Sequence, residues 1–466
     1  MSDVDLAVQY AREHQTDFLD EYKDLLRIPS ISTLPEHTQD MRRAAEWITA
    51  ELERLGFNPV EIMPTAGHPI VYGERLKAGA NAPTILLYGH YDVQPVDPLE
   101  EWKSPPFEPE VRGDNLYARG ASDMKGQLVC FLKALESIIR TSEVKLNLKA
   151  MIEGEEEVGS ANLEDFIAGH KDLLRCDLSL NADTSILAPD TPALTYALRG
   201  LAYYEIRLQG PAGDLHSGTY GGIIENPATV LCRLIGGMHD EEGRVTLPGF
   251  YDRVLPLSAA ERAELAKLPQ TDAWWIEKAK VGSLRSGEPG YTATERATAR
   301  PTLDVNGLLS GFTGVGSKTV LPARAMAKIS MRLVPDQIPD EIAQALRTYL
   351  DDNVPETVRW EIEDLSDCYP AMLSLDSDAA RAAGAALEEV WGKSPLFKRE
   401  GGSVPVVGLI KEMIGVPTLM LGFGLPDDNL HAPNEKQNLP TFFRGIETYI
   451  RLLDKLGARG QRPGST

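Results

Sequence analysis

The sequence predicts an α/β protein with a doubly wound, mostly parallel central sheet and an inserted α+β domain. Short apolar runs such as Ile85–Tyr88 and Leu146–Ile152 alternate with segments of helical periodicity, as in a parallel sheet covered by helices on both faces. Near Arg199 the pattern changes to strands with one polar face. A chain of 466 residues is also too long for one comfortable hydrophobic core, so two domains are expected.

The first part of the chain is predicted to alternate helices and strands. Amphipathic helices are expected over 5–27 and 40–55, with Asp40 as the cap of the second and Gly56 as its end. A long apolar helix is expected over 127–139. Strands are predicted at Val60–Met63, Ile70–Tyr72, Ile85–Tyr88, Leu116–Ala118, Leu146–Ile152 and Leu178–Leu180.

The inserted domain is expected over residues 199–368, between two segments of the first domain, 1–198 and 369–466. Leu201–Leu208 alternates like a strand with one wet face, and the irregular stretch 239–300 is predicted to hold short helices. Of the remaining elements, helices are expected at 227–235, 340–350, 379–391 and 441–456, and strands at 327–333, 358–362 and 416–421.

Composition and charge narrow the class of protein. The chain has 69 acidic and 47 basic residues, a net charge of −22, which argues against a nucleic-acid or anionic-membrane partner. Its 4 cysteines are widely spaced, which indicates reduced core thiols and not a disulfide frame or thiolate metal site. The first residues are acidic where a signal peptide is basic, and no apolar run approaches a membrane span. We therefore expect a soluble cytoplasmic protein.

Polar side chains gather where the predicted strands end. His90 and Asp92 follow the Ile85–Tyr88 strand, and their spacing points both to one side of extended backbone. In open α/β sheets, ligands bind beyond the carboxyl ends of the strands. Further candidates follow other strands or begin the long helix: Glu155, Glu156, Glu157, Asp183, His431 and Asp123.

These residues form a set suited to divalent metals. Clustered carboxylates repel one another unless a cation lies among them. Imidazole and carboxylate donors without thiolates fit Zn²⁺, Mn²⁺ or Co²⁺, and there are enough ligands for two ions. Asp123, Glu157 and Asp183, with one hydroxide, would balance the charge of two divalent ions. Glu156 is then left over as a base beside a water whose pKa the metals lower to roughly 7.

Three other catalytic or nucleotide motifs are incomplete, because each lacks a glycine that its turn requires. Leu387 stands at the first glycine position of a phosphate loop that would end in Gly392-Lys393-Ser394. Asp427 stands at the third glycine position of a dinucleotide loop. Pro405 stands where a nucleophile elbow around Ser403 needs glycine.

In this order along the chain, the motifs resemble a known enzyme family. It is the co-catalytic zinc metallopeptidase and amidohydrolase family of carnosinase-like cytosolic dipeptidases, glutamate carboxypeptidase, aminoacylase and succinyl-diaminopimelate desuccinylase. The large insertion, with 216–222 and 399–403, resembles the dipeptidase branch most closely. The matching pieces are Gly89–Asp92, Arg119–Gly126, Glu155–Ser160, Asp183, His216–Gly218 and His431.

The resemblance implies an activity. It is metal-dependent hydrolysis of the peptide bond in dipeptides or short peptides with a free C-terminal carboxylate. An N-acyl-amino-acid amidohydrolase, which would share every metal residue, is the alternative within the enzyme class. The alternative outside the enzyme class is a two-domain binding protein that closes on a solute and catalyses no reaction.

The resemblance also assigns the metal ligands. Two divalent ions are implied, Zn²⁺ first, with Mn²⁺ or Co²⁺ as alternatives. His90 and Asp183 would bind one ion, Glu157 and His431 the other, and Asp123 would bridge them through a carboxylate that precedes a cis Asp123–Met124 peptide bond.

Other roles implied by the resemblance concern catalysis, substrate and assembly. Glu156 would be the general base, and Asp92 would fix the His90 imidazole. The inserted domain would act as a lid and pair in a homodimer in which each His216 steadies the oxyanion of the neighbouring site. Covering the edge of the Leu201–Leu208 strand would favour such pairing.

Four residues of the inserted domain and the following segment are implied to contact substrate. Arg332 would meet the terminal carboxylate, and Gly402 and Ser403 would line the pocket. Asn306 stands where some dipeptidases of this branch carry histidine, which makes the dipeptide preference less secure than the metal chemistry.

Overall fold

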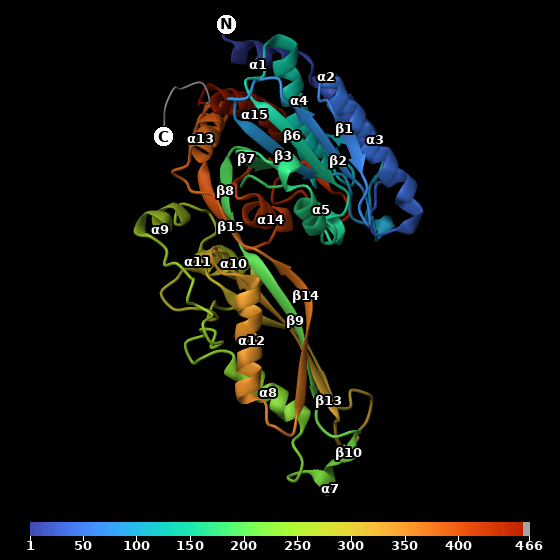
Figure 1. The fold of residues 1–466 in the computed structure, drawn as a ribbon, viewed down its shortest axis with the longest axis vertical. Helices are drawn as coiled ribbons and strands as arrows, with labels where there is room; N and C mark the ends of the chain where they lie inside the picture. The colour runs from blue at the N-terminus through green and yellow to red at the C-terminus, as the bar shows by residue number, and fades with distance from the viewer. Residues whose placement is uncertain (460–466) are drawn as a thin grey trace. The chain divides into compact units, whose positions relative to one another are not determined.

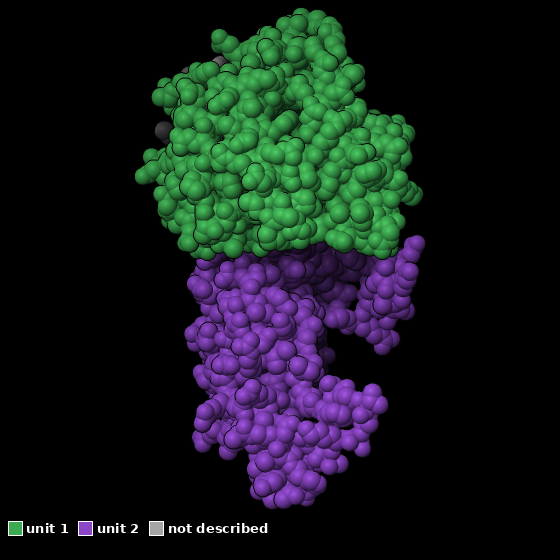
Figure 2. Space-filling model, turned by 90° about the vertical axis from the view of Figure 1, so that its right-hand side faces the viewer, with its two compact units in different colours: residues 1–196, 373–398, 409–466 green, residues 197–372, 399–408 purple. Residues whose placement is uncertain are grey.

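The computed structural model describes residues 1–459, which form two compact units (Figure 2). The first unit comprises residues 1–196, 373–398 and the described residues from 409 onward, and the second comprises 197–372 and 399–408. Residues 399–408, expected in the first domain, belong to the second unit, where Ser403 hydrogen-bonds Arg332.

The sheet of the first unit is parallel at its centre (Figure 1). β6 (Asn147–Glu153), β3 (Thr84–His90), β7 (Leu178–Asn181) and β17 (Thr418–Met420) are successive parallel neighbours. The predicted α/β fold class is confirmed, and the parallel strands form the central part of the sheet. Antiparallel strands extend it on both sides: β2 (Ile70–Arg75) and β1 (Val60–Met63) beyond β6, and β8 (Ala193–Leu198) beyond β17. Two short strands, β15 (Ala371–Met372) and β16 (Leu396–Glu400), pair with β8.

Strand β3 is buried on both faces. Ile85 and Leu87 belong to the hydrophobic core that the helices build, whereas the alternate residues Leu86 and Tyr88 point to the other face and are equally buried. The core helices are α1 (Asp3–Glu13), α2 (Gln15–Leu26), α3 (Thr38–Arg54), α4 (Lys125–Thr141), α13 (Asp378–Trp391) and α15 (Leu439–Arg459). Shorter helices are α5 (Leu163–Gly169), α6 (Lys171–Leu174) and α14 (Pro405–Ile414).

Two helix starts differ from the prediction. The first amphipathic stretch is broken at His14 into α1 and α2. Asp40 is not the cap of α3, because the helix already begins at Thr38 after the cap residue His37. Asp40 instead accepts hydrogen bonds in the first turn, from His37 Nδ1 at 2.9 Å and from Arg43 Nη1 at 2.8 Å, where a carboxylate also favours the helix dipole.

A small separate sheet joins the segment before α4 to the segment before α15. Its strands are β18 (Lys436–Asn438), β5 (Asn115–Tyr117) and β4 (Glu110–Arg112), in that order and antiparallel. Only β5 is predicted, as Leu116–Ala118. The pairing brings the chain after His431 beside the chain that leads to Asp123.

The second unit is a four-stranded antiparallel sheet with helices α8 (Pro227–Gly237) and α12 (Pro339–Asn353) packed against its core face (Figure 1). The strand order is β11 (Thr302–Ser310), β13 (Arg324–Leu333), β9 (Gly200–Gln209) and β14 (Arg359–Cys368). The alternate residues Ala202, Tyr204, Ile206 and Leu208 of β9 are buried in this core, which confirms the strand with one buried face.

The expectation that Leu201–Leu208 supplies a sheet edge is wrong. β9 lies between β13 and β14 and pairs with both over nearly its whole length, so the edges are β11 and β14. The predicted short helices of 239–300 are present as α9 (Ala259–Leu265), α10 (Asp272–Ala279) and α11 (Ala293–Ala299). The remaining pieces are β10 (Leu215–His216), α7 (Ser217–Tyr220) and β12 (Val320–Leu321). Over the described chain, none of the helices is both long and apolar enough to cross a bilayer.

Candidate metal centre

The first unit brings its seven predicted site residues together where parallel strands end. β3 ends at His90, β6 is followed by the 3₁₀ turn Glu156–Val158, and β7 ends two residues before Asp183. Asp123 precedes α4, and the Asp123–Met124 peptide bond is cis, as expected. His431 comes from the loop before β18.

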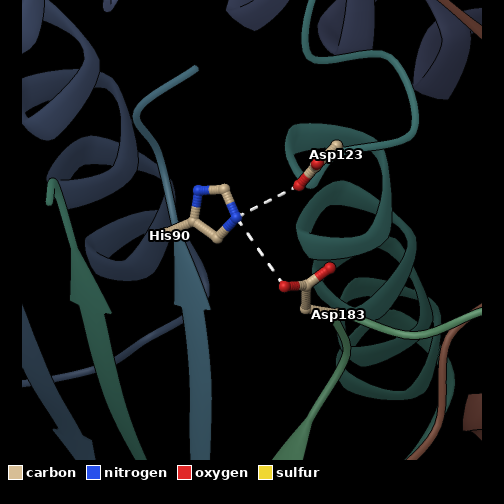
Figure 3. Close-up of side chains that lie close together, drawn as sticks. All are labelled: His90, Asp123 and Asp183. Carbon is tan, nitrogen blue, oxygen red and sulfur yellow. Dashed lines mark ion pairs between the residues drawn. The ribbon is translucent and has the colours of Figure 1, made fainter. Parts of the chain in front are cut away.

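One group of candidate metal ligands consists of His90, Asp123 and Asp183 (Figure 3). His90 Nε2 lies 3.3 Å from Asp123 Oδ1 and 3.8 Å from Asp183 Oδ2, with Glu156 Oε2 at 4.0 Å. The ring is fully buried, yet Nε2 makes no hydrogen bond of good geometry within the described part of the chain. A buried nitrogen that faces three carboxylates without a hydrogen bond is the arrangement of a metal ligand.

Asp92 holds the opposite side of the same ring. His90 Nδ1 lies 3.1 Å from the main-chain oxygen of Asp92 and 3.3 Å from its Oδ1. A donor on Nδ1 directs the lone pair of the neutral ring to Nε2. The other oxygen of Asp92 accepts the backbone N–H of Glu157 at 3.1 Å. Asp92 therefore orients His90 and also fixes the turn that carries the glutamates.

A second group shares Asp123 with the first. His431 Nε2 lies 2.9 Å from Asp123 Oδ2 and 3.3 Å from Glu157 Oε2. Gln94 donates from Nε2 to Glu157 Oε2 at 2.8 Å, which orients that carboxylate. Asp123 thus turns one oxygen to the His90 group and the other to the His431 group, as a bridging carboxylate would.

Burial and neighbouring carboxylates raise the pKa values of two glutamates at this site. Burial raises the pKa of Glu157 to about 8, and the charge of Asp123 adds to the rise. Burial also raises the pKa of Glu156, with further contributions from Asp123 and Asp92 against the lowering effect of His90. The hydrogen bond to Asp123 raises the pKa of His431 to about 9. Cations would relieve this repulsion between carboxylates.

The donor set fits divalent metal ions. In each group the candidate donor atoms lie within 4.8 Å of one another, and imidazole nitrogen with carboxylate oxygen suits Zn²⁺, Mn²⁺ or Co²⁺. A third acidic group, Glu21, Glu51 and Glu136, is not comparable. Lys133 Nζ and Arg54 lie among its carboxylates and neutralise them.

Two of the predicted substrate residues of the second unit, Arg332 and Ser403, are joined by a hydrogen bond. Arg332 on β13 donates from Nη1 to Ser403 Oγ at 3.0 Å, and Ser403 Oγ donates to the main-chain oxygen of Arg199 at 2.6 Å. Arg199 in turn donates from Nε to the main-chain oxygen of Gly401 at 3.1 Å. Burial, and then the like charge of Arg332, lower the pKa of Arg199 to about 10. Gly402 is exposed beside these residues.

His216 and Asn306 are both exposed, and no hydrogen bond joins either to Arg332 or Ser403 among residues 1–459. His216 Nδ1 accepts the backbone N–H of Gly218 at 3.0 Å, so the neutral ring carries its proton on Nε2. Asn306 is the extra residue of a β-bulge in β11, between Val305 and Gly307. Bulges re-aim side chains and are frequent beside active sites.

Several residues around these groups are absent from the predicted set. Gln94 could have been found, because it continues the two-residue spacing of His90 and Asp92 along extended backbone. Arg199 and the buried Glu435, whose carboxylate accepts the backbone N–H of Asp123 at 3.0 Å, show no comparable local pattern.

Comparison with known proteins places the chain in a family. A family model described as peptidase family M20/M25/M40 matches residues 86–455. The chain belongs to this family. It is 32% identical over 461 residues to the Cys-Gly metallodipeptidase DUG1 of Candida albicans, with 94% of each chain covered. It is 28% identical over 462 residues to the Beta-Ala-His dipeptidase of Homo sapiens, covering 95% of this chain and 90% of that one.

A solved structure supports the same assignment for this M20 chain. The M20 family metallo-carboxypeptidase Sso-CP2 from Sulfolobus solfataricus matches it with a TM-score of 0.82 at 33% identity, covering 95% of this chain and 99% of that one. The resemblance to the metallopeptidase family, and to its dipeptidase branch, is therefore confirmed.

Proposed function

We propose that this protein is a metallopeptidase that hydrolyses dipeptides or short peptides with a free C-terminal carboxylate, using two divalent ions, Zn²⁺ first among them. The observation that carries the proposal is the Asp123 carboxylate, which turns Oδ1 to His90 and Oδ2 to His431. The dipeptidase and carboxypeptidase relatives support the substrate class. Neither the site nor these relatives favours the N-acyl amidohydrolase alternative.

In the proposed mechanism Glu156 moves the proton. Metal ions held by His90, Asp183, Asp123, Glu157 and His431 would supply Lewis acidity, which lowers the pKa of a water and polarises an amide carbonyl. Glu156 belongs to neither compact ligand group but borders the first, with Oε2 4.0 Å from His90 Nε2. It takes the proton from the attacking water and returns it to the leaving amine.

Arg332 orients the substrate in this proposal. Its guanidinium makes one hydrogen bond, to the neutral Ser403, and has no carboxylate within ion-pair distance in the described structure, so it keeps donors for a ligand. The nearby Arg199 adds positive charge at the same place. A terminal carboxylate would meet Arg332 through a charge-assisted contact, with Ser403 and Gly402 beside it.

Arg332→Ala is expected to slow hydrolysis of free-acid peptides by roughly 10–150-fold, because a charged hydrogen bond is worth about 1.5–3 kcal/mol. Peptides with an amidated C-terminus should lose much less, since they have no carboxylate for Arg332 to bind. Comparing kcat/KM for the two substrate types in both proteins checks this. Equal losses on both would assign Arg332 a structural role.

The proposal extends to a homodimer in which His216 of one subunit serves the site of the other. His216 is exposed and offers an Nε2–H donor, as the oxyanion role requires. Edge strand β11 supports pairing between copies, because Val305, Leu308 and Leu309 on it are 44–56% exposed. An unpaired edge with apolar side chains is a surface that association covers.

A cytoplasmic location is part of the proposal and is supported by the cysteines, all four of which are free thiols.

The experiment that tests the function challenges the metal-loaded protein in parallel with dipeptides, longer peptides, and N-acetyl and N-succinyl amino acids. Turnover of dipeptides is the expected result. Turnover of the acylated amino acids alone would make the protein an amidohydrolase, and ligand uptake without hydrolysis would make it a binding protein.

A further inference from the structure

Glu435 is a fully buried carboxylate that makes four hydrogen bonds, all as acceptor. Its Oε1 accepts the backbone N–H groups of Ser122 at 2.9 Å and Asp123 at 3.0 Å. Its Oε2 accepts the backbone N–H of Gly120 at 2.9 Å and Arg119 Nη1 at 2.8 Å. Glu435 and Arg119 are both 0% exposed, so this ion pair is held away from solvent.

The donors belong to the segment that presents the bridging carboxylate. Three of the four donors are the backbone N–H groups of Gly120, Ser122 and Asp123 itself. Fixing these N–H groups fixes the position of the Asp123 Cα and hence the point from which its carboxylate reaches the two ligand groups.

The segment that carries Glu435 also carries His431. Asp428, on the other side of His431, accepts Ser122 Oγ at 2.7 Å and the backbone N–H of Leu425 at 2.7 Å. His431 has a φ of +60°, in the left-handed region that residues other than glycine seldom occupy. Such a backbone persists only when its surroundings hold it, and here anchors lie on both sides of it.

We propose that Glu435 is a positioning residue that sets the bridging carboxylate of Asp123 and couples it to the His431 loop, an inference that rests on the proposed metal centre. Asp123 and His431 lie 308 residues apart in the chain. Glu435 connects the two segments through direct hydrogen bonds, so a change at Glu435 shifts Asp123 relative to both ligand groups.

The substitution Glu435→Gln tests the positioning role, because all four hydrogen-bond partners of Glu435 donate to it. In either orientation of the amide, its NH₂ group would face two of these donors. The Gly120–Asp123 backbone must then move, although the side chain keeps its size.

The test is a calorimetric titration of metal-free protein with Co²⁺, together with the visible spectrum of the bound Co²⁺. We expect Glu435→Gln to bind Co²⁺ about 10–100-fold more weakly than the wild type, as is usual when a partner that orients a ligand is lost, with an altered spectrum. A folded Glu435→Gln with wild-type affinity and spectrum would overturn the inference.

Glu288→Gln is the matched control. Glu288 is also buried and accepts two bonds from a buried arginine, Arg300 Nε at 3.0 Å and Nη2 at 2.7 Å, in the second unit. Its loss should lower Tm while leaving Co²⁺ affinity unchanged. If Glu288→Gln and Glu435→Gln weaken Co²⁺ binding equally, the effect is general destabilisation and the positioning role fails.

A second variant covers the case in which Glu435→Gln does not fold. Glu435→Asp keeps the charge beside Arg119 but is one methylene shorter, so it cannot reach all four donors. Weaker Co²⁺ binding by folded Glu435→Asp supports the inference, and wild-type binding overturns it. A wild-type protein that binds no Co²⁺ would overturn the proposed function as well, which separates the two failures.

Discussion

Glu156→Gln is expected to lower kcat by about 10²–10⁴-fold while the metal content stays unchanged, the usual range for loss of a general base. The amide has nearly the size of the carboxylate but cannot accept the proton of a water at neutral pH. Metal should remain, because neither of the two candidate ligand groups includes Glu156. Steady-state kinetics and metal analysis of the same sample check both parts.

Glu155→Gln is the matched control for this experiment. Glu155 is the preceding glutamate, but its oxygens accept from the backbone N–H of His68 at 3.0 Å and from Asn162 Nδ2 at 2.8 Å, outside the two ligand groups. Its substitution should change kcat far less. If Glu156→Gln keeps activity within a few-fold of wild type with its metal intact, Glu156 is not the base.

Mixing two inactive variants is expected to restore activity. Glu156→Gln keeps His216 but lacks the base, and His216→Ala keeps the base but lacks the oxyanion donor. In a two-fold dimer that shares His216 between subunits, a heterodimer has one site with both residues. An equal mixture after subunit exchange should therefore regain about one active site in four. The measurement compares the rate of peptide hydrolysis by the mixture with the rate of each variant alone.

The control for mixing is a sample of each variant carried through the same exchange procedure by itself, which should stay inactive. Mass analysis must show that heterodimers form. If heterodimers are present and the mixture stays inactive, His216 does not serve the neighbouring site.

The fold and most of the centre could be predicted because both depend on short-range patterns. Continuous apolar runs such as Ile85–Tyr88 identify buried parallel strands, and polar residues directly after them fall at one edge of the sheet. His90, Asp92 and Asp183 needed no more than this. The metal roles of His90 and Asp183 and the orienting role of Asp92 stay predictions, which the geometry of the site supports.

What could not be predicted depends on pairing between distant segments. The interior position of β9 follows from strand order, which the alternation of its side chains does not encode. Strand β8 is absent from the predicted elements although all its residues are buried. The role of Glu435 depends on four hydrogen bonds from residues more than 300 positions away in the chain. No local sequence pattern predicts such contacts.

The central claim is that two divalent ions at the Asp123 centre are required for peptide hydrolysis. The direct test strips the protein of metal, confirms the removal by mass spectrometry, and adds Zn²⁺ stepwise while following hydrolysis of a free-acid dipeptide. We predict no turnover in the stripped protein and a rise that levels off at about two equivalents per chain. Full turnover by the verified metal-free protein would contradict the account.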